Sequence, residues 1–474
     1  MERFEVETID EAPALATLPA GERALFFALE ADPAAARDAA RDFLDRKLAE
    51  AQTLPSDIPD DLSTLGGWIA QRTDDVGEQY RAYLASRKGG APRLYFPTRS
   101  AALSFIRHVA PTKLVDGAWL YGLLEQWANP DFHPLIRTYL EELGDGIPDK
   151  NHVVIFRKLL STHGCDQWQD LPDHYFVQGA IQLALGHDAR RYLPEIIGYN
   201  LGYEQLPLHL LITSYELNEL GIDPYYFTLH VTVDNAANGH AQKAVQALRQ
   251  LLPLVGDRAG FLQRVLDGYR LNDLGAGTTS VIASFDIERE LCAILQAKSV
   301  VGKNMHSDYC RVEGRSVNDW LSDPAQVPGF LRAMESSGWI KRGEPVENSR
   351  FWGLVHGERA QMFGVFSSYE QQVLRDWIAS RPEAPSRSFR VQQRSMEELA
   401  PHRPRNERMP RSLLRHHAQE AEHKNELHLL EERVASAGSK ADIMAILLPL
   451  LAPSTHHTAA GLMATRMFSR LLEA

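Results

Sequence analysis

The sequence predicts an all-α fold, and three observations support this prediction. Apolar residues recur every three or four positions in most segments of the chain, which is the period of an amphipathic helix. Gly, Pro or Asp residues separate these segments, as expected for connections between neighbouring helices. Only two short stretches, VTV at 231–233 and SVIASF at 280–285, have strand character. An antiparallel helical bundle is therefore the expected architecture.

Local signals place the first elements of this fold. Asp32 and Pro33 match the N-cap and the first position of a helix that continues through AAARDAARDFLDRKLAEAQ. A second helical stretch covers about 60–86, and the Gly- and Pro-containing stretch at 88–92 is typical of a linker. The full length of 474 residues is enough for about three structural units at the usual ~150 residues each.

Shifts in composition divide the rest of the chain. Aromatic residues are concentrated after residue 300, which favours a compact satellite core, and arginines and prolines dominate the stretch from 381. The expected organisation is an N-terminal helical unit (1–90), a long helical bundle (91–300), an aromatic-rich satellite subdomain (301–380), an Arg/Pro-rich linker (381–412) and a C-terminal helical segment (413–474). The histidines after residue 400 are expected to be ordinary surface residues rather than metal ligands: His402, His416, His417, His423, His428, His456 and His457.

Composition and charge argue against several classes of protein. The 50 Lys and Arg residues are outnumbered by 62 Asp and Glu, a net charge of -12 that disfavours electrostatic binding of nucleic acid. The 3 cysteines are too few and too scattered for a disulfide framework. No apolar run approaches the ~20 residues of a membrane span. The acidic N-terminus lacks the apolar core of a secretory signal. We therefore expect a cytoplasmic location.

The segment EELGDGIPDKNH places two acids and a histidine around a predicted helix–loop–helix turn. Glu141 and Glu142 occupy the last helical turn, where the partial negative charge of the helix end disfavours acids. A bound cation would reverse this cost, although an exposed acid there costs at most ~1 kcal/mol, so chance placement is an alternative. Because His152 opens the next helix, Glu142 and His152 can face each other across the turn.

Two later segments carry similar residue types. His230 and Asp234 in FTLHVTVD are four residues apart, so both can reach one site on a helix, either as metal ligands or as a structural hydrogen bond. Glu204 lies in an apolar stretch, and a buried Glu needs a partner. Glu195 follows Pro194 in a first helical turn, where an acid is expected for electrostatic reasons alone. On a straight helix Glu195 and Glu204 point to opposite faces and should not share a site.

Taken together, ELGDG followed by a histidine, PEIIGYNLGYEQ and HVTVDNAANGHA resemble the heme-oxygenase-like diiron oxidases, an iron-containing redox enzyme family. The resemblance spans about residues 95–300. It implies a heme-oxygenase-like helical bundle, with helical extensions at both ends, that binds Fe(2+), two ions per chain, and activates dioxygen. Carried over residue by residue, it implies six metal ligands: Glu142, His152, Glu204, His230, Asp234 and His240.

The last of these ligands departs from the family pattern, His-x3-Asp-x2-His. Ala237 occupies the position of the final histidine, and His240 follows three residues later. On an uninterrupted helix His240 would lie about 15 Å along the axis from His230 and about 80° around it. Asn238-Gly239 is a turn-forming pair, and a break there would return His240 to the site. Without that return, the second iron would lack a ligand or be weakly held.

The resemblance implies an oxidoreductase that acts on a small amine, an amino-acid-like or a fatty-acid-like molecule by N-oxygenation, desaturation or C–C cleavage. Its expected partners are the substrate and dioxygen, and an external electron donor is compatible with this chemistry. Imidazole and carboxylate ligands suit iron, whereas no phosphate-binding loop, GxSxG or HExxH motif is present. The alternatives are a non-catalytic scaffold or binding module with a degenerate metal site, which Ala237 favours, and an enzyme with a single iron.

Overall fold

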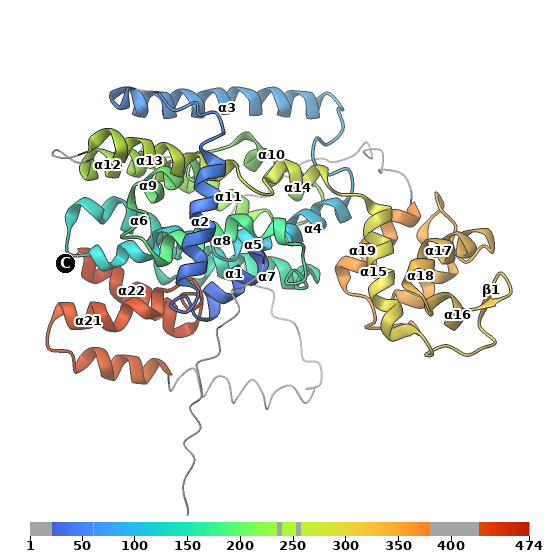
Figure 1. The fold of residues 1–474 in the computed structure, drawn as a ribbon. Coiled ribbons are helices and arrows are strands. Elements are labelled where there is room, and N and C mark those ends of the chain that lie inside the picture. The colour runs from blue at the N-terminus through green and yellow to red at the C-terminus, as the bar shows by residue number, and fades with distance from the viewer. Residues whose placement is uncertain (1–20, 60, 235–238, 253–256, 380–425, 474) are drawn as a thin grey trace, which may run out of the picture.

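The computed structural model describes residues 21–59, 61–234, 239–252, 257–379 and 426–473 (Figure 1). These residues are mostly helical, which confirms the predicted all-α fold. Within them, one antiparallel pair of two-residue strands occurs, β1 (Arg311–Val312) and β2 (Arg315–Ser316).

The two stretches with strand character are helical in the structure. Residues 231–233 lie in α11 (Tyr225–Asp234), and most of 280–285 lies in α14 (Thr278–Ala283). Intrinsic β-propensity is weak and depends on pairing with a neighbouring strand, and these segments have helices as neighbours. The helical context therefore decides their conformation.

The N-terminal helices pack against the central bundle. Helix α1 (Glu22–Ala31) buries Phe26, whose ring lies 5.4 Å from that of Phe176 at an edge-to-face angle. Helix α2 (Arg37–Ala51) begins later than predicted, because Asp32 accepts a hydrogen bond from the amide of Ala35 and so closes a preceding turn. Helix α3 (Leu65–Lys88) crosses α10 and α12 on the outside of the bundle (Figure 1).

Short helices in varied orientations build the bundle that carries the site. Its further α-helices are α4 (Arg99–His108), α5 (Ala110–Lys113), α6 (His133–Glu142), α7 (His152–His163), α8 (Val177–His187), α9 (Leu193–Tyr203), α10 (Leu208–Glu219), α12 (His240–Leu251) and α13 (Arg258–Arg270). Helices α9 and α13 pack along each other, and Arg264 of α13 donates to the buried carboxylate of Glu195 at 2.6 Å. The 3-10 helices η2 (Ala118–Gln126), η4 (Gly144–Gly146) and η5 (Pro148–Lys150) connect the α-helices around the site.

The aromatic-rich region lies at one end of the bundle (Figure 1). Its elements are α15 (Ile287–Gly302), the two strands, α16 (Val317–Leu321), α17 (Val327–Ser336), α18 (Arg350–Val355) and α19 (Ser368–Ala379). Arginines cover several of its aromatic rings, as in the pair Arg342 and Trp377 at 4.4 Å. Helix α19 contacts α4 of the bundle, where Asp376 accepts a hydrogen bond from the amide of Ser100 at 2.8 Å.

The C-terminal segment returns to the bundle. Residues 426–435 are helical and are followed by α21 (Lys440–Leu447), η10 (Leu448–Leu451) and α22 (Ala459–Glu473), which packs against η4 (Figure 1). The predicted Arg/Pro-rich linker, 381–412, lies outside the described residues. Among the described helices, none is long and apolar enough to cross a membrane.

Candidate metal centre

The connection between α6 and α7 brings Glu142 and His152 together. Helix α6 ends at Glu142, two 3-10 turns follow, and Asn151 caps α7 by accepting a hydrogen bond from the amide of Val154 at 3.0 Å. His152, the first residue of α7, then points its Nδ1 at Oε2 of Glu142. The two residues predicted to face each other across this turn do so, and both are almost fully buried.

A first group of possible metal ligands gathers around this pair. His230 of α11 and Asp116, between α5 and η2, join Glu142 and His152, and the nearest ligand atoms of the four all lie within 4.8 Å of one another. Nε2 of His230 is 3.1 Å from Oδ2 of Asp116. Four buried side chains from four separate parts of the chain therefore converge on one point.

A second group shares Glu142 with the first. Nδ1 of His240 lies 2.9 Å from Oε2 of Glu204 and 3.4 Å from Oε1 of Glu142. These three buried residues also offer ligand atoms within 4.8 Å of one another. One oxygen of Glu142 thus faces the first group and the other faces the second, an arrangement suited to a carboxylate shared between two cations.

Sequence reasoning missed Asp116. Its carboxylate accepts hydrogen bonds from the hydroxyls of Tyr203, at 2.8 Å, and Tyr226, at 2.6 Å. Gly117 follows it with a φ of 81°, and a Cβ there would lie 3.0 Å from Cβ of Glu142, so only glycine lets this loop approach α6. The available signal was a lone acid between apolar residues, in KLVDGAWL, which is the same signal that singled out Glu204.

The remaining predicted ligands have different outcomes. Glu204 is the C-cap of α9, directly after the last residue of that helix. Helix α11 ends at Asp234 and α12 begins at His240, so the histidine does not have to lie on the helix that carries His230. The side chain of Asp234 lies outside the described residues, and its role stays a prediction. Glu195 pairs with Arg264 away from the site, as its position on the opposite face of the helix predicted.

Hydrogen bonds fix the orientation of two of the imidazoles. Nδ1 of His230 lies 2.8 Å from the carbonyl oxygen of Tyr226, which leaves Nε2 to face the cluster. Nε2 of His240 lies 2.8 Å from Oε2 of Glu141, which leaves Nδ1 to face Glu142 and Glu204. Lys243 in turn donates to Glu141 at 2.6 Å. Partners of this kind on the outer nitrogen are what hold histidine ligands in a fixed tautomer.

The buried carboxylates of the cluster favour a bound cation. Burial raises the pKa of Glu204, whose Oε1 has no hydrogen-bond partner among the described residues. Burial lowers the pKa of His152, but Glu142 and Asp116 outweigh it and raise that pKa to about 10. Burial also lowers the pKa of His240. Neighbouring carboxylates, led by Glu204, outweigh it and raise that pKa well above its usual range. The carboxylates thus favour positive charge at both imidazoles, and bound metal ions can supply that charge in place of protons.

A cavity of about 980 Å³ adjoins the cluster. His230, Tyr203 and Lys113 line it where it meets the two groups of possible ligands, and α3 and residues 275–280 line it further out. Nζ of Lys113 donates to the hydroxyl of Tyr203 at 2.8 Å and lies 4.0 Å from Oδ1 of Asp116. A molecule in this cavity can therefore reach the edge of the cluster.

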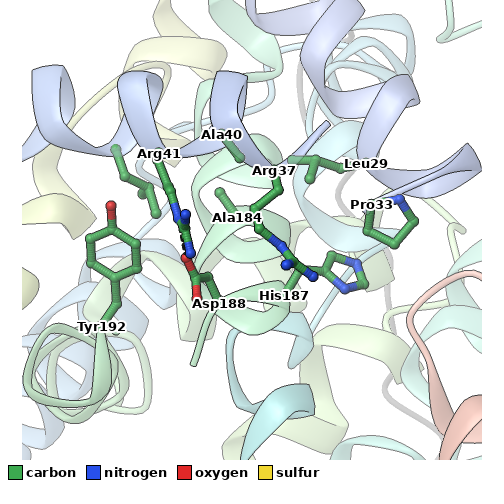
Figure 2. A pocket seen from close by; sticks show the side chains of 10 residues that line it. Leu29, Pro33, Arg37, Ala40, Arg41, Ala184, His187, Asp188 and Tyr192 are labelled. Carbon is green, nitrogen blue, oxygen red and sulfur yellow. Dashed lines mark hydrogen bonds and ion pairs between the residues drawn. The ribbon is translucent and has the colours of Figure 1, made fainter. Parts of the chain in front are cut away.

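A second hollow lies between α2 and α8, away from the site (Figure 2). Its volume of about 10 Å³ is enough for about one water molecule. Arg41 and Asp188 form an ion pair across it at 2.6 Å, as Figure 2 shows. This pair ties α2 to the end of α8, and the hollow is too small for a substrate.

Helical bundles build metal sites from buried carboxylates and imidazoles that face one another in the core, and this chain presents such side chains. Residues 103–273 match the model of a family described as iron-containing redox enzymes, which confirms the resemblance found in the sequence. The matched region contains every residue of both ligand groups. Comparisons with curated proteins and with solved structures gave no match. The family suggests an oxidoreductase, and the buried cluster fits iron binding.

Proposed function

We propose that this chain is a non-heme oxidoreductase that binds two iron ions and uses dioxygen to oxidise a small organic molecule. The observation that carries this proposal is the position of Glu142 between two groups of ligand atoms. A heme would need one axial histidine and would leave three buried carboxylates without a role: Asp116, Glu142 and Glu204.

The residues divide naturally between two ions. Asp116, His152 and His230 would hold one, Glu204 and His240 would hold the other, and Glu142 would serve both. Three carboxylates largely compensate the charge of two divalent ions, and imidazole with carboxylate is a ligand set that iron accepts. When bound, ferrous ions would supply electrons for the reduction of dioxygen.

The surrounding side chains protect and orient this site. Tyr203 and Tyr226 donate their hydroxyl hydrogens to Asp116 and fix the direction of its carboxylate. The fully buried rings of Trp119 and Tyr226 help to keep bulk water from the ligands. Water exclusion strengthens the interactions between the charged groups inside the site.

The cavity favours a substrate that carries a carboxylate. With a metal ion compensating Asp116, Lys113 presents its positive charge to the cavity at the edge of the cluster. Burial and the charge of Lys113 lower the pKa of nearby His209 to about 4, so this imidazole is neutral at physiological pH. Arg72, further out, is already paired with Asp57. Among the substrate classes that the sequence suggested, the amino-acid-like and fatty-acid-like molecules fit this charge better than a simple amine, with N-oxygenation, desaturation and C–C cleavage as the candidate reactions.

A single-iron enzyme and a scaffold with a degenerate site are the competing functions. Counting the shared Glu142 in each, the first group has four possible ligands and the second has three, which is the feature that favours one iron. Ala237 favoured the degenerate site, but His240 supplies an imidazole to the second group from the start of α12.

Iron stoichiometry and the reaction with oxygen test the proposal. Anaerobic protein is titrated with Fe(II), the bound iron is counted after desalting, and the sample is mixed with oxygen while its visible absorbance is followed. We expect two irons per chain and a transient absorbance that depends on oxygen. One iron would favour the single-iron enzyme, and less than one iron with no absorbance change would overturn the redox function.

A further inference from the structure

One buried side chain, that of Asn151, links the segments that carry Glu142 and His152. Its Oδ1 accepts the amide hydrogen of Val154 and so starts α7, which carries His152 as its first residue. Its Nδ2 donates to the carbonyl oxygen of Leu143, the residue after Glu142, at 3.2 Å. Asn151 therefore ties the end of α6 to the beginning of α7, and both ends carry a proposed metal ligand.

The second hydrogen of this amide group points to the C-terminal segment. Nδ2 of Asn151 lies 3.1 Å from Nδ1 of His456, a residue 305 positions later in the chain. His456 is 1% exposed, which corrects the expectation that it is a surface residue. Burial lowers its pKa well below the usual range, so its imidazole is neutral and Nδ1 can accept the hydrogen bond.

Two further contacts from the same segment hold this loop, and a third holds α6. Oγ of Ser469 in α22 donates to Oδ1 of Asp145 at 2.7 Å. Gly146, with a φ of 76°, approaches α22 so closely that a Cβ there would lie 2.2 Å from the carbonyl oxygen of Leu462. On α6, the buried hydroxyl of Tyr139 donates to the carbonyl oxygen of Leu451 at 2.6 Å.

We propose that the C-terminal segment, residues 440–473, is part of the metal-site scaffold and that His456 is a positioning residue for the ligands Glu142 and His152. The inference rests on the proposed function, because it concerns the same two ligands. It assigns a role to a segment outside the matched region, 103–273. His456 contacts Asn151 rather than a ligand, so it acts by fixing the loop that presents them.

The test compares full-length variants at His456 with a neighbouring control. His456→Phe fills the space but removes the acceptor, His456→Gln restores an acceptor, and His457→Ala changes the adjacent histidine, for which no hydrogen bond to Asn151 is present among the described residues. The measurements are Fe(II) affinity under anaerobic conditions, the visible spectrum of Co(II)-substituted protein, and helix content by circular dichroism. Loss of an outer partner of a metal ligand typically weakens metal binding 10–100-fold, and we expect a weakening of about 10-fold for His456→Phe because it acts one residue further away.

We expect His456→Phe to bind iron more weakly with a shifted Co(II) spectrum and unchanged helix content, while His456→Gln and His457→Ala stay near wild type. If His456→Phe does not fold, Ser469→Ala replaces it, with the same direction expected because it releases Asp145. Wild-type affinity and an unchanged spectrum in the folded variant would overturn the inference alone. A wild-type protein that binds less than one iron would overturn the proposed function itself.

Discussion

Glu142 and His240 lie on different helices, yet the carboxylate of one faces the imidazole of the other at 3.4 Å. The other oxygen of Glu142 is paired with His152, so a single side chain joins the two ligand groups. This relationship makes the two proposed ions interdependent, since any change at Glu142 affects both.

Replacing Glu142 should therefore remove more iron than replacing any other ligand. In Glu142→Gln the first group keeps three ligands and the second keeps two. We expect fewer than one iron per chain where wild type binds two, complete loss of turnover, and helix content near wild type. Glu195→Gln is the matched control, because Glu195 is equally buried but pairs with Arg264. Equal iron loss in both variants would show that replacing any buried Glu lowers iron binding, and that Glu142 has no special role as a ligand.

The two histidines at the ends of the cluster should separate the two ions. His230→Ala removes a ligand from the first group only, and His240→Ala removes one from the second only. We expect each variant to retain about one iron, and their Mössbauer spectra should report different environments because different ligands remain. Identical residual spectra would mean that the two groups form one site.

Glu141 should strengthen binding of the second ion by orienting His240, without contacting the ion itself. It accepts the hydrogen of Nε2 of His240, and Lys243 holds it in place. Glu141→Ala should weaken Fe(II) binding about 10–100-fold at the second site and leave the first unchanged. Glu141→Gln retains an acceptor and should remain close to wild type. Unchanged affinity in Glu141→Ala would show that other contacts orient His240.

The metal-free protein should lose stability as the pH rises. The pKa of His152 is raised to about 10 in the folded state, against about 6.5 unfolded, so its stabilising contribution is complete below about pH 6.5 and is lost as pH rises toward 10. Metal binding needs the neutral imidazole, so metal affinity should increase as the pH rises. Thermal unfolding at pH 6.5 and 9 checks the first expectation. Titration with Mn(II) at pH 6.5 and 8, with proton release recorded, checks the second. A metal-free melting temperature that rises between pH 6.5 and 9 would contradict the assigned charges.

Lys113 should make the protein bind a carboxylate more tightly than the corresponding amide. A hydrogen bond to a charged group contributes about 1.5–3 kcal/mol, or roughly 10- to 150-fold in affinity. We expect iron-loaded anaerobic protein to bind octanoate more tightly than octanamide, and Lys113→Met to abolish this preference while Lys113→Arg retains part of it. Calorimetry with both probes provides the measurement. Equal binding of the two probes to wild type would remove the argument for an acidic substrate.

The sequence was informative where the relevant geometry is local. Helical periodicity predicted the all-α fold, and the short turn between Glu142 and His152 predicted that they face each other. Asp116 was missed because its partners, Tyr203 and Tyr226, lie about 90 to 110 residues later in the chain. No spacing rule connects residues that distant, and only the packed helices bring them together.

Two other features show the same limit. The position of His240 depends on where α11 ends and α12 begins, and helix boundaries are the least certain part of any sequence-based prediction. His456 follows the apolar stretch LLPLLAPST and precedes a second histidine, and nothing near it in the sequence distinguishes a buried histidine from an exposed one. Its contact with Asn151 exists only after the C-terminal helices pack on the bundle.

The proposed site holds two irons, one on either side of Glu142. Crystals of protein loaded anaerobically with Fe(II), measured on both sides of the iron absorption edge, would locate the ions by anomalous scattering. We predict two peaks about 3.5–4 Å apart, one beside His152, His230 and Asp116 and one beside Glu204 and His240. A single peak, or peaks away from Glu142, would contradict the account.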